Sequence, residues 1–356
     1  MNKLRVLLIG AAFSADLHSD AYSRILDKVT ISGICDKDTS RVRALAERYG
    51  FEGYETYDDY DAAIRDCDCD LVDICMPNFL HHDVAIKALK RGRNIICEKP
   101  LATTVEDAQD MVDTADRLGR HIYYAEDWLF APAFRKARSI LESGQLGRQL
   151  YIRARECHSG SHSPFAQRIR YCGGGCMVHL GVHPVGFMLA LKDNRWRELV
   201  AMTSGGSDAN LVHRQMEGED WAGAFMRFDD GTFATLEANY TTVGGMEDVL
   251  DIYCEQGCIH VDPSFSGPVR VFSIPGLDYT VEKAEITTGW STPAVDEKYS
   301  LGYCGEIEHF VERALEDRDA QIGLRGRDGL ETLKVINLIY RSAREGVRVT
   351  NDSLEA

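Results

Sequence analysis

A lysine and a histidine in this chain stand in positions suited to the oxidation of an alcohol. Lys99 belongs to Glu98-Lys99-Pro100, which directly follows the apolar run Asn94–Cys97, and His183 follows Gly173-Gly174-Gly175. The first motif places the lysine at the carboxyl end of a buried strand, where open α/β sheets bind their ligands. Hydride leaves a carbon only as the hydroxyl proton is removed, so a lysine and a histidine beside a dinucleotide suit dehydrogenation. We therefore predict an oxidoreductase.

A dinucleotide-binding turn is predicted after the first strand. Gly10-Ala11-Ala12-Phe13-Ser14-Ala15 stands where such a turn carries G-x-G-x-x-G, and only the first glycine is kept. Taken alone the turn is a weak signal, but Asp36 ends the second strand about twenty residues further on, where a carboxylate binds the ribose diol. Asp36 would repel a 2′-phosphate, which favours NAD over NADP, although Lys37 and Arg41 nearby leave NADP open. The alternative role of Asp36 is to cap the following turn.

The first 125 or so residues alternate short apolar runs with amphipathic stretches. Continuously apolar strands separated by helices predict a parallel sheet that is covered on both faces. One predicted helix, Ser40–Tyr49, is closed by Gly50, and another, Val105–Leu118, begins after Thr104. The predicted strands of this domain, residues 1–125, are Leu4–Ile9, Thr30–Cys35, Leu71–Met76, Ile95–Cys97 and His121–Ala125.

The pattern changes after residue 125, which predicts a second domain over residues 126–356. Gln149–Arg155 alternates with period two, and later strands come in hairpins that turn at Asp229-Asp230-Gly231 and at Gln256-Gly257. These hairpins indicate an antiparallel meander and a domain of α+β type. The predicted hairpin strands are Ala222–Phe228, Thr232–Ala238, Val249–Glu255 and Cys258–Val261.

Composition excludes several classes of protein. The 356 residues carry 40 Lys and Arg against 56 Asp and Glu, a formal charge of −16, which disfavours nucleic acid and membrane surfaces. No stretch of sequence approaches a membrane span, and the first apolar run is too short for a signal sequence. Eleven scattered cysteines indicate reduced thiols and a cytoplasmic protein.

Together these motifs resemble the glucose-fructose oxidoreductase and inositol dehydrogenase (Gfo/Idh/MocA) family. The resemblance rests on Gly10, Asp36, Pro77-Asn78 with His81, Glu98-Lys99-Pro100, and the glycine run leading to Gly181-x-His183, and these motifs run in order over most of the chain. The resemblance implies a Rossmann domain and a second domain with a large open mixed, mostly antiparallel sheet. That sheet commonly carries the substrate and mediates a homo-oligomer, a dimer or larger. Family substrates are mostly sugars, cyclitols and their derivatives.

The resemblance also assigns roles to residues. Lys99 is expected to contact the substrate hydroxyl and the nicotinamide ribose, and His183 to act as acid and base. A partly desolvated lysine beside a cationic ring can relay a proton, and histidine titrates near neutral pH. The residues expected to hold the cofactor are Gly10, Ala12, Phe13, Ser14, Asp36, Pro77, Asn78, His81, Glu98 and Lys99.

One position departs from the family pattern. Members often have aspartate four residues before the catalytic histidine, where this chain has His179. On a continuous helix His179 and His183 would face the same way and form a coupled pair in the proton relay. Glu156 and His158 project from one face of an alternating strand and are expected to join them at the substrate.

Two further interpretations of these side chains stay open. Glu156, His158, His179 and His183 could form a metal site, but no spacing among them is a closed motif, so we expect no metal. Aromatic faces for a sugar could come from Trp128, which we expect at the substrate, and from Phe130, Tyr171 and Trp290, although core packing is the default for each.

The predicted function is NAD-dependent oxidation of a ring hydroxyl of a sugar, glycoside or cyclitol to a ketone. A rival is an NADP-linked reductase of a small carbonyl or imine. A third possibility is a non-catalytic NAD-binding sensor, against which the presence of both Lys99 and His183 argues. The sequence leaves open the sugar, the carbon oxidised and the physiological direction.

Overall fold

A computed structural model describes residues 3–161, 163–264, 269–276, 288–293 and 295–354. The chain divides into two compact units: unit 1 holds residues 1–130 and 302–331, and unit 2 holds residues 131–301 and 332–356. The sequence placed a single boundary after residue 125, and the units differ from it chiefly in residues 302–331. This segment returns to unit 1, where Lys28 Nζ lies 2.7 Å from carboxylate oxygens of both Glu308 and Glu312. The order of strand and helix patterns along the sequence does not reveal that this segment packs in unit 1.

Unit 1 is built on a six-stranded parallel sheet of order β3-β2-β1-β4-β5-β6. This is the strand order of a dinucleotide-binding Rossmann fold, which places the carboxyl ends of β1 and β4 side by side at the point where the order reverses. The predicted parallel sheet is confirmed. Its strands are β1 (Leu4–Ile9), β2 (Val29–Cys35), β3 (Glu55–Tyr57), β4 (Leu71–Ile74), β5 (Asn94–Glu98) and β6 (Ile122–Ala125).

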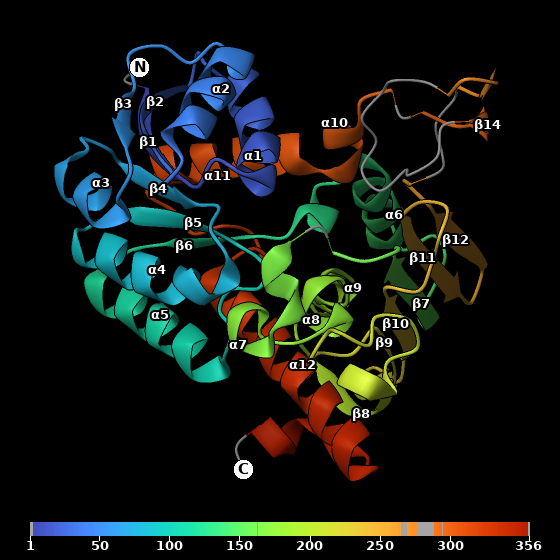
Figure 1. Cartoon of the computed structure of the whole chain (residues 1–356). Coiled ribbons are helices and arrows are strands. Elements are labelled where there is room, and N and C mark those ends of the chain that lie inside the picture. Colours follow the sequence, from blue (N-terminus) through green and yellow to red (C-terminus); the bar gives the residue numbers. More distant parts are fainter. Residues whose placement is uncertain (1–2, 162, 265–268, 277–287, 294, 355–356) are drawn as a thin grey trace. The chain divides into compact units, whose positions relative to one another are not determined.

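The helices of unit 1 form two layers. In one layer, α1 contacts both α2 and α11. In the other, α4 contacts both α3 and α5, and Figure 1 shows these three helices stacked along one side of the sheet. The helices are α1 (Phe13–Ser23), α2 (Thr39–Tyr49), α3 (Tyr60–Asp66), α4 (His81–Lys90), α5 (Val105–Leu118) and α11 (Tyr303–Leu315), with short turns η1 (Asn78–Leu80) and η2 (Asp127–Leu129). Helix α12 (Gly326–Glu345) begins in unit 1 and ends in unit 2.

Unit 2 is built on a seven-stranded sheet of order β12-β11-β7-β10-β9-β8-β15. Strands β7 and β10 pair in parallel and every other neighbouring pair is antiparallel, which confirms the mixed, mostly antiparallel sheet. The strands are β7 (Gln149–Cys157), β8 (Trp196–Thr203), β9 (Trp221–Phe228), β10 (Phe233–Asn239), β11 (Glu247–Cys254), β12 (Gly257–Val261) and β15 (Val349–Thr350), and a separate hairpin holds β13 (Val271–Ser273) and β14 (Gly289–Ser291).

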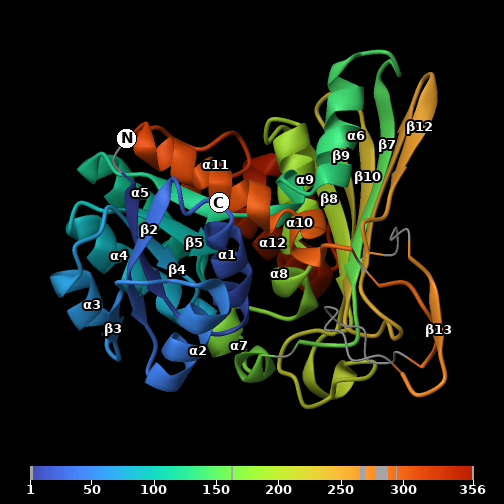
Figure 2. The ribbon, with the colours of Figure 1, turned by 90° about the horizontal axis from the view of Figure 1, so that it is seen from above.

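Helices cover one face of the unit 2 sheet. Figure 2 shows α6, α8 and α9 on the same side of strands β7–β10, and no described helix lies on the opposite side. The helices are α6 (Pro132–Glu142), α7 (Ile169–Cys172), α8 (Cys176–His179), α9 (Val182–Leu191) and α10 (Glu297–Leu301), with short turns η3 (Pro164–Gln167), η4 (Ser207–Ala209) and η5 (Asn351–Leu354). Among the described residues, no helix therefore covers the second face of this sheet, which we call its open face.

Within the described ranges, no single helix has both the length and the apolar character needed to cross a membrane. One bent pair, Ile169–His179 with Val182–Leu191, meets these criteria by length and composition only.

Candidate active site

The turn between β1 and α1 has the geometry of a dinucleotide cradle. Gly10 has φ +108°, and a Cβ at this position would lie 2.1 Å from the carbonyl oxygen of Cys75, so only glycine fits. Asp36, at the end of β2, accepts a hydrogen bond from Ala11 N (2.9 Å) through Oδ2 and from Asp38 N (2.9 Å) through Oδ1. Asp36 thus supports both turns and is only half-buried, which leaves it accessible to a ribose.

The missing second glycine of the fingerprint causes no strain. Ala12 is the N-cap of α1 with φ −105°, a conformation open to any L-residue, and its side chain is exposed. Phe13 is 56% exposed and Ser14 is half-buried. The first turn of this eleven-residue helix therefore presents backbone N–H groups at the surface, which suits a pyrophosphate.

The loops after β4 and β5 are joined by a buried histidine. Pro77 and Asn78 are half-buried at the start of η1, whereas His81 is fully buried. His81 Nδ1 lies 2.9 Å from Pro100 O, and its Nε2 lies 2.9 Å from Met76 O. Burial lowers the pKa of this imidazole. Any effect of His81 on cofactor binding acts through the two loops.

Lys99 follows β5 directly and is half-buried, and its peptide bond to Pro100 is cis. Glu98 is 8% exposed, and its Oε2 accepts from Lys99 N at 3.1 Å. Burial opposes ionisation of Glu98, but His18, whose Nε2 lies 3.2 Å from Glu98 Oε1, holds the pKa of this carboxyl below its ordinary value. The lysine therefore stands beside a carboxylate at the carboxyl edge of the sheet, on the same edge as Gly10 and Asp36.

In unit 2, His183 faces a buried carboxylate. His183 lies near the start of α9, and its Nε2 is 3.9 Å from Oε2 of Glu156 on β7. Both side chains are at most 5% exposed. A carboxylate at this distance favours the protonated form of an imidazole.

His179 and His183 do not lie on one continuous helix, which corrects the expectation drawn from their spacing. Helix α8 ends at His179, and the chain bends by 58° between Ile169–His179 and Val182–Leu191. Gly181 allows the bend because a Cβ there would lie 2.2 Å from Met177 Sδ. The two imidazoles therefore lack the common face that i, i+4 spacing would give them.

His179 instead pairs with a tyrosine that the sequence did not single out. Its Nδ1 lies 2.5 Å from the hydroxyl of Tyr240, which is 1% exposed. Burial, followed by nearby acidic groups, raises the pKa of Tyr240 well above its ordinary value, so the phenol keeps its proton and donates it to Nδ1. A neutral His179 then carries its own proton on Nε2 and can donate a hydrogen bond, where the family's aspartate would accept one.

The four candidate metal ligands are largely engaged within the protein. His158 Nδ1 accepts from Gly160 N at 3.0 Å, and its ring lies 5.1 Å from the Tyr240 ring. Of the described side chains Glu156, His158, His179 and His183, no three bring their ligand atoms within 4.8 Å of one another.

Tyr240 could have been found from strand pairing. Strands β7 and β10 run parallel with Cys157 opposite Asn239, so the residues that follow them, His158 and Tyr240, emerge at the same edge. Sequence patterns identify both strands but not their pairing. The sequence therefore predicts His158 at the site but not Tyr240.

Glu219, also missed, organises the glycine-rich turn. Its carboxylate accepts from Gly175 N (3.2 Å), from Met177 N (2.8 Å) and from the hydroxyl of Tyr340 (3.0 Å). Burial raises the pKa of Glu219. A Cβ on Gly175 would lie 2.1 Å from Glu219 O, so the turn and this carboxylate fit only with glycine.

The aromatic candidates are mostly engaged in packing. Trp128 is 2% exposed and Phe130 is 8% exposed, which leaves neither ring a free face for a sugar. Tyr171 is half-buried against Phe165, with ring centroids 5.9 Å apart. Trp290 is 68% exposed on the β13–β14 hairpin.

Comparison with known proteins identifies the family. Residues 4–126 match the NAD-binding Rossmann domain of the GFO/IDH/MocA oxidoreductase family, and residues 134–260 match that family's C-terminal domain. The chain belongs to the GFO/IDH/MocA family. The predicted fold, the oxidoreductase activity and NAD as the cofactor are confirmed, and the turn at Gly10 fits this cofactor.

Relatives of this family member include several sugar dehydrogenases. It is 26% identical to D-glucoside 3-dehydrogenase of Escherichia coli over 97% of each chain, and 24% identical to scyllo-inositol 2-dehydrogenase of Bacillus subtilis over 78% of this chain and 77% of that one. Among solved structures, GenD2 from gentamicin A biosynthesis, in complex with NAD, has a TM-score of 0.88 at 22% identity and covers 98% of this chain and 97% of its own.

Proposed function

We propose that this protein oxidises a ring hydroxyl of a sugar, glycoside or cyclitol to a ketone and passes the hydride to NAD. The observation that carries the proposal is the position of Lys99, a half-buried amine one residue past β5 on the cofactor edge of the sheet. The similarity to D-glucoside 3-dehydrogenase and to scyllo-inositol 2-dehydrogenase supports this substrate class.

Each candidate residue has a role in this reaction. We assign Lys99 to polarise the hydroxyl oxygen and His183 to take its proton, with Glu156 stabilising the resulting imidazolium. His179 and His158 are assigned to hydrogen bonds with the substrate. Bound NAD supplies the hydride acceptor.

The alternatives are less well supported. An NADP-linked reductase requires a site for a 2′-phosphate, and Asp36 places a carboxylate where that phosphate would sit. A non-catalytic sensor would not require a lysine and a histidine at both catalytic positions of the family.

The test is the absorbance of reduced nicotinamide after the purified protein is mixed with NAD or NADP and a panel of glycosides, free sugars and inositols. We expect NADH formation with at least one glycoside or inositol. Cofactor binding without turnover on the panel would favour the sensor, whereas oxidation of NADPH by aldehydes, ketones or imines would favour the reductase.

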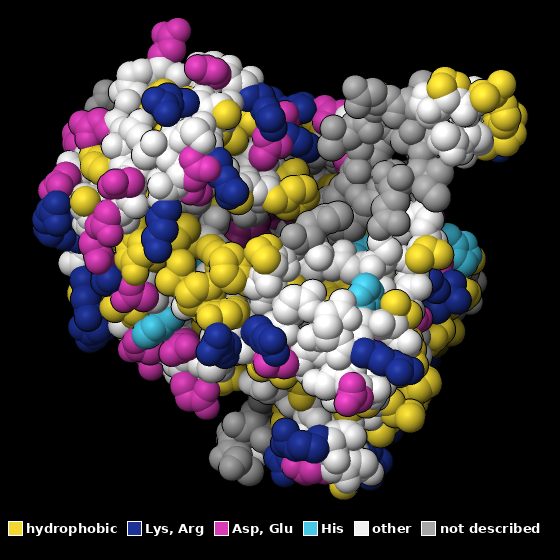
Figure 3. Space-filling view, in the orientation of Figure 1, with side chains coloured by type: hydrophobic (Ala, Val, Ile, Leu, Met, Phe, Trp, Pro, Cys, Tyr) yellow, Lys and Arg dark blue, Asp and Glu magenta, His cyan; other side chains and the backbone are white. Residues whose placement is uncertain are grey.

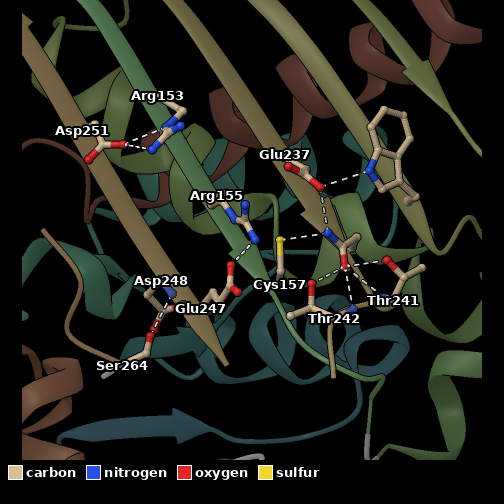
Figure 4. A network of polar contacts seen from close by, with 12 residues as sticks. Arg153, Arg155, Cys157, Glu237, Thr241, Thr242, Glu247, Asp248, Asp251 and Ser264 are labelled. Atoms are coloured by element: carbon tan, nitrogen blue, oxygen red, sulfur yellow. Dashed lines mark hydrogen bonds and ion pairs between the residues drawn. The ribbon is translucent and has the colours of Figure 1, made fainter. Parts of the chain in front are cut away.

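We also propose that the open face of the unit 2 sheet binds a second copy of this chain. Large exposed apolar side chains gather on this face, namely Val200, Met202, Phe225 and Phe233, and the first three line a hollow of about 550 Å³. Figure 4 shows how the charged groups beside them pair within the face, Arg153 with Asp251 and Arg155 with Glu247. An apolar surface whose charges are already neutralised suits a self-complementary dimer interface.

We further propose a cytoplasmic location without a nucleic-acid partner. All eleven cysteines are free thiols, and nine of them are buried, which is consistent with a reducing compartment. Acidic and basic side chains are interspersed over the face drawn in Figure 3. Phosphate binding would instead favour a clustered basic surface.

A further inference from the structure

A fully buried histidine lies beneath the cofactor edge of unit 1, between two carboxylates. His18, on α1, places Nδ1 2.9 Å from Asp73 Oδ2, and its Nε2 lies 3.2 Å from Glu98 Oε1. The hydroxyl of Tyr22 donates to Asp73 Oδ2 at 2.9 Å. His18 therefore joins α1 to the ends of β4 and β5, and the carboxylate at the end of β5 precedes Lys99.

The two carboxylates beside His18 favour its protonated form. Burial alone would lower the pKa of His18, but the charge of Asp73 raises it well above its ordinary value. The Cys75 thiol stays neutral, because burial raises its pKa to about 12. An imidazolium can pair with both carboxylates at once, one through each ring nitrogen.

Several titratable groups around Glu98 affect whether this buried carboxyl is ionised. Glu98 is also faced by His81, by Lys99 and, from α11, by Glu306. Burial raises the pKa of Glu306 well above its ordinary value and lowers the pKa of His81, which disfavours the charged form of each group. His18 is then the buried cation that offsets the cost of an ionised Glu98.

We propose that His18 is a positioning residue for Lys99: as a buried imidazolium it keeps Glu98 ionised, and the Glu98 carboxylate holds the backbone of Lys99 and stabilises its protonated amine. The backbone contact is the 3.1 Å hydrogen bond from Lys99 N to Glu98 Oε2. This inference rests on the proton-transfer role proposed for Lys99. It adds a residue that touches neither substrate nor cofactor yet sets the pH at which Lys99 gives up its proton.

The protonation state of His18 can be measured directly in the unmodified protein with NAD bound. Histidine labelled with ¹⁵N reports the charge of each imidazole by NMR during a pH titration, and the signal of His18 is assigned by its loss in His18→Gln. We expect the ring to stay protonated well past the ordinary titration of histidine near 6.5. A neutral ring at pH 7.5 would overturn the proposal, and this result does not depend on how any variant folds.

Variants test the link to Lys99, with turnover of NAD measured on methyl glucopyranosides and myo-inositol. His18→Gln and Glu98→Gln should each lower kcat about tenfold or more while KM for NAD changes little, because the lysine is mispositioned but the Gly10 turn remains. In both variants the protonated amine of Lys99 loses the negative charge of Glu98. The limb of the pH–rate profile that reports Lys99 should therefore move to lower pH. The double variant should shift it no further.

Tyr22→Phe is the matched control, because it removes one hydrogen bond to Asp73 and leaves both ion pairs of His18. Its pH profile should match that of the unmodified protein. A His18→Gln protein with unchanged kcat and pH profile, whatever its melting temperature, would show that His18 only stabilises the fold. Full activity of Lys99→Met would instead refute the proposed role of Lys99, so the two failures are distinguishable.

Discussion

At the scale of single residues, the amine of Lys99 is the group whose removal should be most costly to turnover. Lys99→Met should lower kcat about a hundredfold or more, the usual scale for a positioned proton-transfer group, while NAD binding stays near normal. Steady-state kinetics and fluorescence titration with NADH check this. Lys90→Met, on the exposed surface of α4, is the control and should behave as the unmodified protein. A Lys99→Met protein with near-normal kcat would remove this residue from the site.

Asp36 should set the preference for NAD. Asp36→Ser keeps a short hydrogen-bond acceptor near Ala11 N but removes the charge that repels a 2′-phosphate, so the ratio of kcat/KM for NAD to that for NADP should fall about tenfold or more. Asp38→Ser changes the carboxylate that caps α2 and should leave the ratio unchanged. If the unmodified protein already prefers NADP, Asp36 does not bind the ribose.

His179 and His183 should respond differently to substitution. His183→Ala should abolish turnover, because it removes the base. His179→Asp, which restores the residue common in the family, should retain partial activity with a shifted pH optimum, since a hydrogen-bond donor becomes an acceptor. Tyr240→Phe should resemble a weaker form of this variant, because it frees Nδ1 of His179. Equal loss in all three variants would argue against separate roles.

The same residues test the metal alternative. Metal analysis of protein prepared without added ions should find no stoichiometric transition metal, and a chelator should leave turnover unchanged. Activity that is lost with the chelator and restored by a transition metal would show that Glu156, His158, His179 and His183 hold an ion.

At the scale of elements, the glycine-rich turn before α8 depends on close backbone contact with Glu219. Gly175→Ala adds a Cβ 2.1 Å from Glu219 O and should destabilise the protein by about 1–3 kcal/mol or more, with a larger relative loss of kcat because α8 carries His179. Urea unfolding and kinetics measure the two effects. Tyr340→Phe removes only one donor to Glu219 and should cost about 1 kcal/mol. Normal stability of Gly175→Ala would mean that the turn adapts.

Local signals predicted some elements well. Helix α5 begins and ends as expected because Thr104 caps it, accepting from Asp107 N at 3.1 Å, and Gly119 ends it with φ +61°. Strand β1 likewise matches, because Leu4–Ile9 is apolar at every position except Arg5 and is followed by Gly10, a pattern that fits one buried strand and a turn. The apolar run Asn94–Cys97 likewise predicts the buried strand that Lys99 follows.

Elements that depend on tertiary packing could not be predicted. The break between α8 and α9 depends on the close approach of Gly181 to Met177, although Gly181 and Pro184 are local signals of a helix boundary. The parallel pairing of β7 with β10, which brings Tyr240 beside His158, is a long-range choice. The buried pairing of His18 with Glu98 joins residues eighty positions apart.

At the scale of the whole molecule, the open sheet face of unit 2 should control the oligomeric state. Phe225 is 66% exposed near the middle of this face, so Phe225→Glu should convert a dimer or larger assembly to monomers, because a buried unpaired charge at an interface is costly. Light scattering after size-exclusion chromatography measures the mass. Leu118→Glu, the same kind of change on α5, should leave the assembly intact. A monomeric unmodified protein would refute the proposal.

The central claim is that hydride passes from a ring carbon of a carbohydrate to NAD. The most direct measurement incubates the protein with NAD and substrates deuterated at their ring carbons, methyl glucopyranosides and inositols, and then analyses the nicotinamide by mass spectrometry and NMR. We predict NADH that carries deuterium on one face of the nicotinamide ring, together with a ketone at a single ring carbon of the substrate, and neither product with Lys99→Met. NADH free of deuterium, or deuterium drawn only from a small non-ring alcohol or aldehyde, would contradict the proposed reaction.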